Sequence, residues 1–112
     1  MSTHDLTLTE ANFDSEVANG VVLVDFWAPR CPPCRRLGPI ISKVAAAMHG
    51  KAKVAKCNVD ECPRLAERYG VRGIPALVFL RDGHETERLQ GFQEERLLLE
   101  KLNTATQPNS SR

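Results

Sequence analysis

The stretch Val21–Trp27 constrains the fold more than any other part of the sequence, because every residue in it except Asp25 is apolar. A strand that is apolar along its whole length is typical of a sheet that is covered by helices on both faces. The segment behind it has apolar residues at helical spacing: Leu37, Ile40, Ile41, Val44 and Met48. A buried strand that leads directly into an amphipathic helix predicts an α/β fold.

The rest of the chain continues the alternation of strand and helix. Further strands are expected at 5–8, 51–58, 76–80 and 85–90, and further helices at 9–19, 60–69 and 94–103. Asp82-Gly83 is a hairpin-turn signal between the last two strands. The order β-α-β-α-β-α-β-β-α predicts three layers, with a central mixed five-stranded sheet and helices on both of its faces.

Two cysteines, Cys31 and Cys34, stand two residues apart where the strand gives way to the helix. The free amide hydrogens and the dipole at a helix N-terminus favour a thiolate over a thiol. Cys34 lies one turn further along on the same face, close enough to bond to Cys31. This arrangement predicts thiol–disulfide exchange, in which Cys31 attacks a substrate disulfide and Cys34 resolves the mixed disulfide.

The residues around the cysteines have opposing effects on a thiolate. Pro32 and Pro33 suit a first helical turn, but they remove two amide hydrogens that could have faced the Cys31 sulfur. Three nearby arginines add positive charge, which favours the thiolate: Arg30, Arg35 and Arg36. The sequence leaves the balance between the two effects open.

A Cys-x-x-Cys motif is equally typical of half a zinc site, which here would need Cys57 and Cys62 as further ligands. Zinc requires four ligands that converge tetrahedrally. Cys57 follows Lys56 in a strand, so the two side chains face opposite sides of the sheet, which argues against convergence. Cys57 is expected in the apolar core, and Cys62 as an exposed thiol at a helix start, either regulatory or incidental.

Asp25 is the single acid in the buried strand, six residues before Cys31. Burial raises the pKa of a carboxyl group, so Asp25 could exchange a proton near neutrality. It is either the proton acceptor for Cys34 or an acid held by hydrogen bonds in the core. Lys56 either pairs with Asp25 or extends its stem along apolar surface towards water.

Composition limits the classes of partner and compartment. A net charge of +1 does not favour nucleic acid or an anionic membrane surface. The sequence has no apolar run of the roughly 20 residues that span a bilayer. The start of the sequence lacks a secretory pattern, so we expect a cytoplasmic protein. The length of 112 residues predicts one domain, which we place at 1–104. Residues 105–112 are expected to form a flexible tail because they are polar, and the protein is expected to be a monomer.

The sequence resembles the thioredoxin family from about Leu6 to Leu102. The matching stretches are Val24–Ala28, the two cysteines with Pro39, Val54–Asp60, Tyr69–Pro75 and Gly91. The resemblance implies that Cys31 is the nucleophile, Cys34 the resolving cysteine, Asp25 the buried acid and Lys56 its neighbour. It also implies a cis Ile74-Pro75 bond against the disulfide, with the Ile74 backbone open to an incoming peptide. Substrate contacts are expected from Trp27, Arg30, Pro32, Pro33, Gly73, Ile74, Pro75 and Gly91.

The family's usual motif is Trp-Cys-Gly-Pro-Cys, whereas this chain has Arg30 and Pro32 in place of the tryptophan and the glycine. The cation should alter partner choice, and the proline should stiffen the loop. The resemblance implies a reductase of disulfide-containing proteins, with a donor of the thioredoxin-reductase type and no metal or cofactor beyond the Cys31–Cys34 disulfide. The alternatives are an oxidant or isomerase, and a docking subunit without catalysis.

Overall fold

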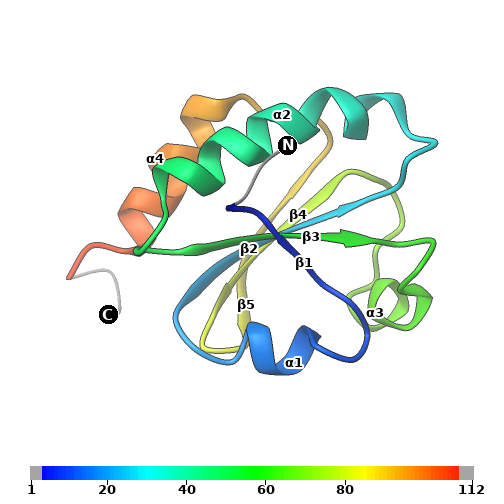
Figure 1. Ribbon diagram of the computed structural model, residues 1–112, viewed down its shortest axis with the longest axis horizontal. Coiled ribbons are helices and arrows are strands. Elements are labelled where there is room, and N and C mark those ends of the chain that lie inside the picture. Colours follow the sequence, from blue (N-terminus) through cyan, green and yellow to red (C-terminus); the bar gives the residue numbers. More distant parts are fainter. Residues whose placement is uncertain (1–3, 109–112) are drawn as a thin grey trace.

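The computed structural model describes residues 4–108, which contain one five-stranded sheet in the order β1-β3-β2-β4-β5 (Figure 1). The strands are β1 Leu6–Thr7, β2 Val21–Trp27, β3 Lys53–Asn58, β4 Ala76–Arg81 and β5 His84–Gln90. β3 is parallel to β1 and β2, whereas β4 is antiparallel to β2 and β5. The predicted mixed sheet is therefore confirmed.

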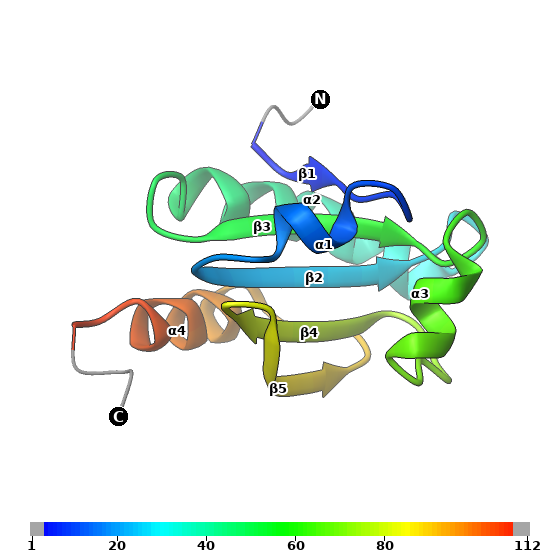
Figure 2. The same ribbon diagram turned by 90° about the horizontal axis from the view of Figure 1, so that it is seen from below.

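In the described part of the chain, four helices cover the sheet, as the sequence predicts: α1 Phe13–Glu16, α2 Pro32–Ala47, α3 Pro63–Arg68 and α4 Glu95–Ala105. α2 and α4 lie together on one face, and α1 and α3 lie on the other (Figures 1 and 2). Within residues 4–108, no helix combines the length and the apolar character that crossing a membrane requires.

Strand β2 is buried on both faces because alternate side chains enter two separate cores. Leu23 packs with residues of α2 and α4, including Leu37 and Leu98. Phe26 packs on the opposite face with Phe13 of α1. β2 is the central strand of the sheet, so β3 and β4 support its C-terminal end on either side. α2 is the next element along the chain after this end.

Three helices differ in length from the prediction: α1, α4 and α3, which covers only Pro63–Arg68 of the expected 60–69. α1 is shorter, because the Thr9 N–H donates to Asn12 Oδ1 at 2.7 Å and the Asn12 N–H donates to Thr9 Oγ1 at 3.1 Å. This reciprocal turn occupies the residues that were expected to begin the helix. α4 extends to Ala105, one residue past the predicted domain end, and the Arg81 guanidinium donates to the Ala105 carbonyl. Residues 109–112 of the predicted tail lie outside the described residues.

The predicted Asp-Gly hairpin turn joins β4 to β5. Asp82 and Gly83 both have positive φ, at 50° and 85°. Positive φ at both central residues is typical of the two-residue hairpin turn whose twist matches that of the flanking strands. Asp82 Oδ1 also accepts from the Gly20 N–H at 2.7 Å, which ties the turn to the start of β2. The hairpin thereby places β5, and the loop that follows it, along the edge of β4.

Candidate active site

Cys31 and Cys34 form a disulfide at the start of α2, with their Cα atoms 5.2 Å apart. Cys31 is the N-cap residue, with extended φ and ψ of −102° and 108°, and Pro32 and Pro33 form the first turn. The Cys34 N–H donates to Cys31 Sγ at 3.2 Å. Since prolines have no N–H, this is the first amide of α2 that can stabilise charge on the Cys31 sulfur. Cys31 is 7% exposed and Cys34 is 2% exposed, so Cys31 is the more accessible sulfur.

The loop before β4 lies against this disulfide. The Ile74-Pro75 peptide bond is cis, and the Ile74 carbonyl oxygen is 3.6 Å from Cys31 Sγ. The Gly91 N–H donates to the Pro75 carbonyl at 2.8 Å, so the residue after β5 holds the loop in place. Gly91 has a φ of 86°, which glycine adopts without strain. The cis bond beside the sulfurs, which the family resemblance implied, is confirmed.

A groove of about 400 Å³ extends from this loop and brings several predicted substrate-binding residues together. Arg30, Gly73 and Ile74 line it, and its apolar wall includes Val59 and Val71. Its other lining residues are Asp60, Pro63, Ala66 and Arg72. A β-carbon on Gly73 would lie 2.8 Å from Gln90 Nε2, so the absence of a side chain lets this loop pack against Gln90. Ile74 connects the groove to the disulfide, because its carbonyl oxygen lies 3.6 Å from Cys31 Sγ.

Trp27 lies outside this groove, although we predicted it as a substrate contact. It lines a separate hollow of about 350 Å³. The Lys56 ammonium lies 5.3 Å from the centre of the Trp27 ring, within the range of a cation–π contact. The other lining residues are Asp5, Thr7, Ser42, Asn58 and Glu61. Only part of the predicted substrate contacts therefore line these two depressions: Arg30, Gly73 and Ile74 line the groove and Trp27 lines the hollow, whereas Pro32, Pro33, Pro75 and Gly91 line neither.

Asp25 is fully buried on the α2 face of the sheet, in register with Lys56 on β3. Neither carboxylate oxygen has a hydrogen-bond partner among the described residues, so the alternative of an acid held by hydrogen bonds in the core is not supported. Burial raises the pKa of Asp25 to about 7, and the charge of Lys56 partly opposes that rise. The carboxyl group is therefore able to gain or lose a proton near neutral pH.

Comparison with known proteins identifies the same family that the sequence motifs indicated. The family model described as Thioredoxin matches residues 4–104. The chain belongs to the thioredoxin family. Thioredoxins of the Staphylococcus aureus strains MW2 and COL are each 44% identical to it over 96 residues, which cover 86% of this chain and 92% of theirs. The solved structure of a point-mutant thioredoxin from Halobacterium salinarum NRC-1 is similar, with a TM-score of 0.84, 37% identity and 96% of both chains covered.

The family and the bonded cysteine pair together make this protein a thiol–disulfide oxidoreductase with a redox-active Cys31–Cys34 disulfide. Membership in the family implies disulfide-containing substrates and an electron donor of the reductase class. Arg30 stands at the groove rim, where its guanidinium lies 3.1 Å from Asp60 Oδ1. Its side chain is 68% exposed, so the cation remains accessible to a bound partner.

The other two cysteines of the chain lie on the opposite side of the sheet. Cys57 is buried in the core, as predicted, and burial together with the neighbouring Cys62 raises the pKa of its thiol. The expectation that Cys62 is exposed is wrong, because it is only 2% exposed and its Sγ lies 3.7 Å from the Leu8 carbonyl oxygen. The segment that leads into α1 covers it, which the local helix-start pattern did not reveal.

Sequence reasoning also missed Asp5, whose Oδ2 lies 3.7 Å from the Lys56 ammonium. Thr7 pairs with Lys56 in the sheet register. Because strand side chains alternate, Asp5 extends to the same side as Thr7. In the sequence, this alternation was the one signal that Asp5 lies on the same side of the sheet as Lys56.

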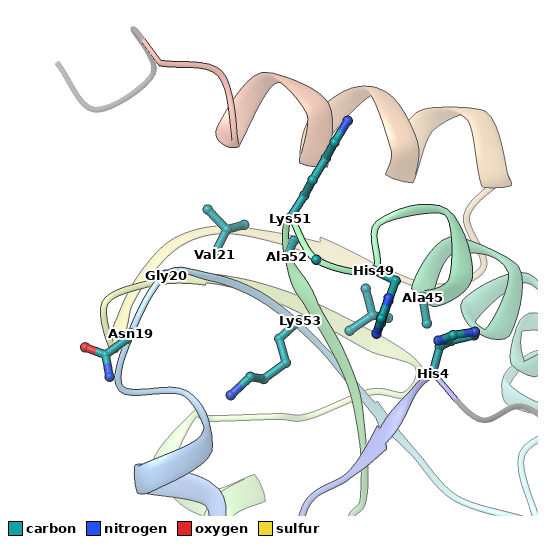
Figure 3. Close-up of a pocket in the computed structure, with 11 residues that line it drawn as sticks. His4, Asn19, Gly20, Val21, Ala45, His49, Lys51, Ala52 and Lys53 are labelled. Atoms are coloured by element: carbon teal, nitrogen blue, oxygen red, sulfur yellow. The ribbon is translucent and has the colours of Figure 1, made fainter.

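A pocket of about 350 Å³ lies at the other end of β2 and α2, remote from the disulfide (Figure 3). His4 and His49 stand beside each other in it, with ring centroids 4.8 Å apart. Lys51 and Lys53 point away from them in opposite directions, and the Lys53 ammonium contacts the Glu16 carboxylate at 3.1 Å. None of the predicted site residues line this pocket.

Proposed function

We propose that this protein is a protein-disulfide reductase in which Cys31 is the nucleophile and Cys34 the resolving cysteine. The observation that carries the proposal is the position of Cys31 Sγ, which accepts the Cys34 N–H at the start of α2 and lies 3.6 Å from the Ile74 carbonyl at the end of the groove. A helix N-terminus favours the thiolate, and the groove provides room for the substrate segment that carries the disulfide.

Reduction proceeds from the dithiol form in two exchanges. The Cys31 thiolate attacks one sulfur of the substrate disulfide, so a mixed disulfide forms and the other substrate sulfur leaves as a thiolate that takes up a proton. Cys34 then loses its proton and attacks Cys31 Sγ, which releases the second substrate sulfur as a thiolate that is also protonated. The substrate gains two electrons and two protons, and the Cys31–Cys34 disulfide is formed. A donor of the reductase class returns the pair to the dithiol.

Asp25 is the proton acceptor for Cys34 in the second exchange. Its carboxyl group is buried on the face of the sheet that α2 covers, and its pKa of about 7 suits proton transfer at neutral pH. Neither of its oxygens has a partner among the described residues, so both are available to a proton carried directly or through a water. Lys56 lies beside it in the sheet register and moderates its charge.

The substrate segment binds in an extended conformation along the loop that carries Ile74, whose backbone polar groups pair with those of the peptide. Arg30 and Gly73 line the groove that receives its side chains. Pro32 and Pro33 form the tip of the site beside the disulfide, and Pro75 is held in place by the Gly91 N–H. Trp27 faces the other hollow and borders the approach to Lys56.

The reductase proposal is tested by the reduction of insulin with a small dithiol as electron donor. The wild-type protein is expected to accelerate reduction, and Cys31→Ser to lower the rate to that of the dithiol alone, because serine cannot form the mixed disulfide. Equilibration with glutathione then places the potential: a value near about −270 mV fits a reductase, whereas one near about −180 mV fits an isomerase. A wild-type protein without activity would contradict the proposal, and a cellular role that persists without Cys31 and Cys34 would favour a docking subunit.

Arg30→Ala is expected to slow the reduction of disulfides flanked by acidic residues a few-fold, with little effect on stability. The exposed ion pair with Asp60 contributes little to folding, since such pairs are well hydrated. The cation at the rim instead attracts an acidic partner, and salt weakens that attraction. The measurement is kcat/KM on paired acidic and neutral disulfide peptides at low and high salt. An equal loss for both peptides would show that Arg30 does not select for charge.

A further inference from the structure

We propose that Asp5 is a positioning residue for Asp25, because it holds the Lys56 ammonium at the mouth of its hollow and away from the buried carboxyl group. Lys56 Nζ lies 3.7 Å from Asp5 Oδ2. In contrast, no described side chain donates a hydrogen bond to either oxygen of Asp25, although Lys56 is its neighbour in the sheet register. Lys56 is thus directed towards the carboxylate of Asp5 and not towards that of Asp25.

Asp5 is held firmly enough to have this effect. Its side chain is only 9% exposed, and Ser42 of α2 donates its hydroxyl to Asp5 Oδ2 at 3.3 Å. Lys56 is 25% exposed, and its ammonium also lies 5.3 Å from the centre of the Trp27 ring. The lysine ammonium therefore lies between the Asp5 carboxylate, which Ser42 also contacts, and the Trp27 ring.

Few of the described residues place a charge near Asp25, so the effect of Asp5 on the pKa of Asp25 can be separated from the effects of other charges. β3 contributes Lys56 and the residues before β1 contribute Asp5, whereas α2, which covers this face of the sheet, carries the cysteine pair at its start. β4 contributes the apolar Leu77, which pairs with Asp25 in the antiparallel register, and Glu61 is a further lining residue of the hollow. A negative charge on Asp5 disfavours ionisation of Asp25 directly, and it also neutralises the cation that would favour ionisation.

The contact between Asp5 and Lys56 affects the pH range of the second exchange. This consequence rests on the proposed role of Asp25 as proton acceptor. Asp5 keeps Asp25 a stronger base than a carboxylate paired with a lysine would be. If Asp5 loses its charge, Lys56 is free to turn inwards and favour the ionised form of Asp25. The acidic limb of the resolving step then moves to lower pH, and the carboxylate becomes a weaker proton acceptor.

The test is an NMR titration of the Asp25 carboxyl carbon in the reduced protein, for the wild type and for Asp5→Asn. The substitution is isosteric and retains an oxygen for Ser42. We expect the pKa of Asp25 to fall by about one unit or more, the size of effect that an opposite charge produces at close range. Asp14→Asn is the matched control, because it removes one carboxylate from the opposite side of the sheet, and it should leave the titration unchanged. An unchanged pKa in Asp5→Asn would overturn the inference.

A double-mutant cycle with Lys56→Met shows whether Asp5 acts through the lysine. We expect most of the effect of Asp5→Asn to disappear in the Lys56→Met background, and an undiminished effect would overturn the positioning role. The NMR titration does not depend on turnover, so it is separate from the reductase proposal. If the pKa of Asp25 shifts but the pH dependence of mixed-disulfide resolution does not, Asp5 controls Lys56 as inferred, and the proton-acceptor role of Asp25 is wrong.

Discussion

Replacing Cys34 with serine is expected to stop turnover and to leave the protein covalently joined to its substrate through Cys31. The Cys34 N–H belongs to the backbone, so its hydrogen bond to Cys31 Sγ at 3.2 Å remains possible after the substitution. The first exchange therefore still occurs. The serine hydroxyl does not attack the mixed disulfide, so the second exchange stops and the adduct accumulates.

The adduct is measured by mass spectrometry and by gel electrophoresis without reductant, after Cys34→Ser is mixed with a disulfide-containing protein. Cys31→Ser is expected to form none of it, because Cys34 is 2% exposed and lies behind Cys31. The matched control is Cys62→Ser, which removes a buried thiol on the opposite side of the sheet and should still turn over without trapping substrate. An adduct on Cys57 or Cys62 in the Cys34→Ser protein would contradict the assignment of the nucleophile.

The fold was predictable because its central element carries an unambiguous pattern. β2 is apolar on both faces, and the alternating segments around it leave little choice but a sheet with two helical layers. The hairpin was equally clear, since Asp82-Gly83 adopts the positive φ values that this pair of residues favours. The helix boundaries were less certain, because the Thr9–Asn12 turn and the contact of Arg81 with Ala105 depend on neighbours that periodicity does not describe.

The cysteine motif could be identified from the sequence, and Asp25 could be singled out as a candidate, because both combine chemistry with an unusual position. The cis bond before Pro75 could not be derived from the residues alone and was implied by the family resemblance. The burial of Cys62 and the contact between Asp5 and Lys56 were missed because both depend on the chain before α1, which folds across distant elements. Tertiary packing, rather than local pattern, decides the surroundings of these side chains.

Asp25 is expected to make the protein less stable as the pH rises from about 4 to 7, and Asp25→Asn is expected to remove that part of the pH dependence. The pKa of Asp25 is raised from 3.8 to about 7 in the folded protein, mainly by burial. Between these values the folded state binds a proton that the unfolded state has lost, so the free energy of unfolding falls with increasing pH. The stabilisation is complete below the unfolded pKa and is lost as the pH rises through the folded one. A difference of this size corresponds to about 4 kcal/mol, a large part of the stability of a small domain.

The measurement is urea denaturation of the oxidised protein at a series of pH values, for the wild type and for Asp25→Asn. Other carboxylates affect both proteins alike, so the difference between the two curves isolates Asp25. We expect Asp25→Asn to gain stability relative to the wild type from pH 4 to 7, and the gain to level off above that range. Asp14→Asn is the control, because its carboxylate is 76% exposed, and its curve should stay parallel to that of the wild type. Parallel curves for Asp25→Asn and the wild type would mean that Asp25 ionises as readily in the folded protein as in the unfolded chain, and a carboxylate of that kind would be too weak a base to take the proton of Cys34.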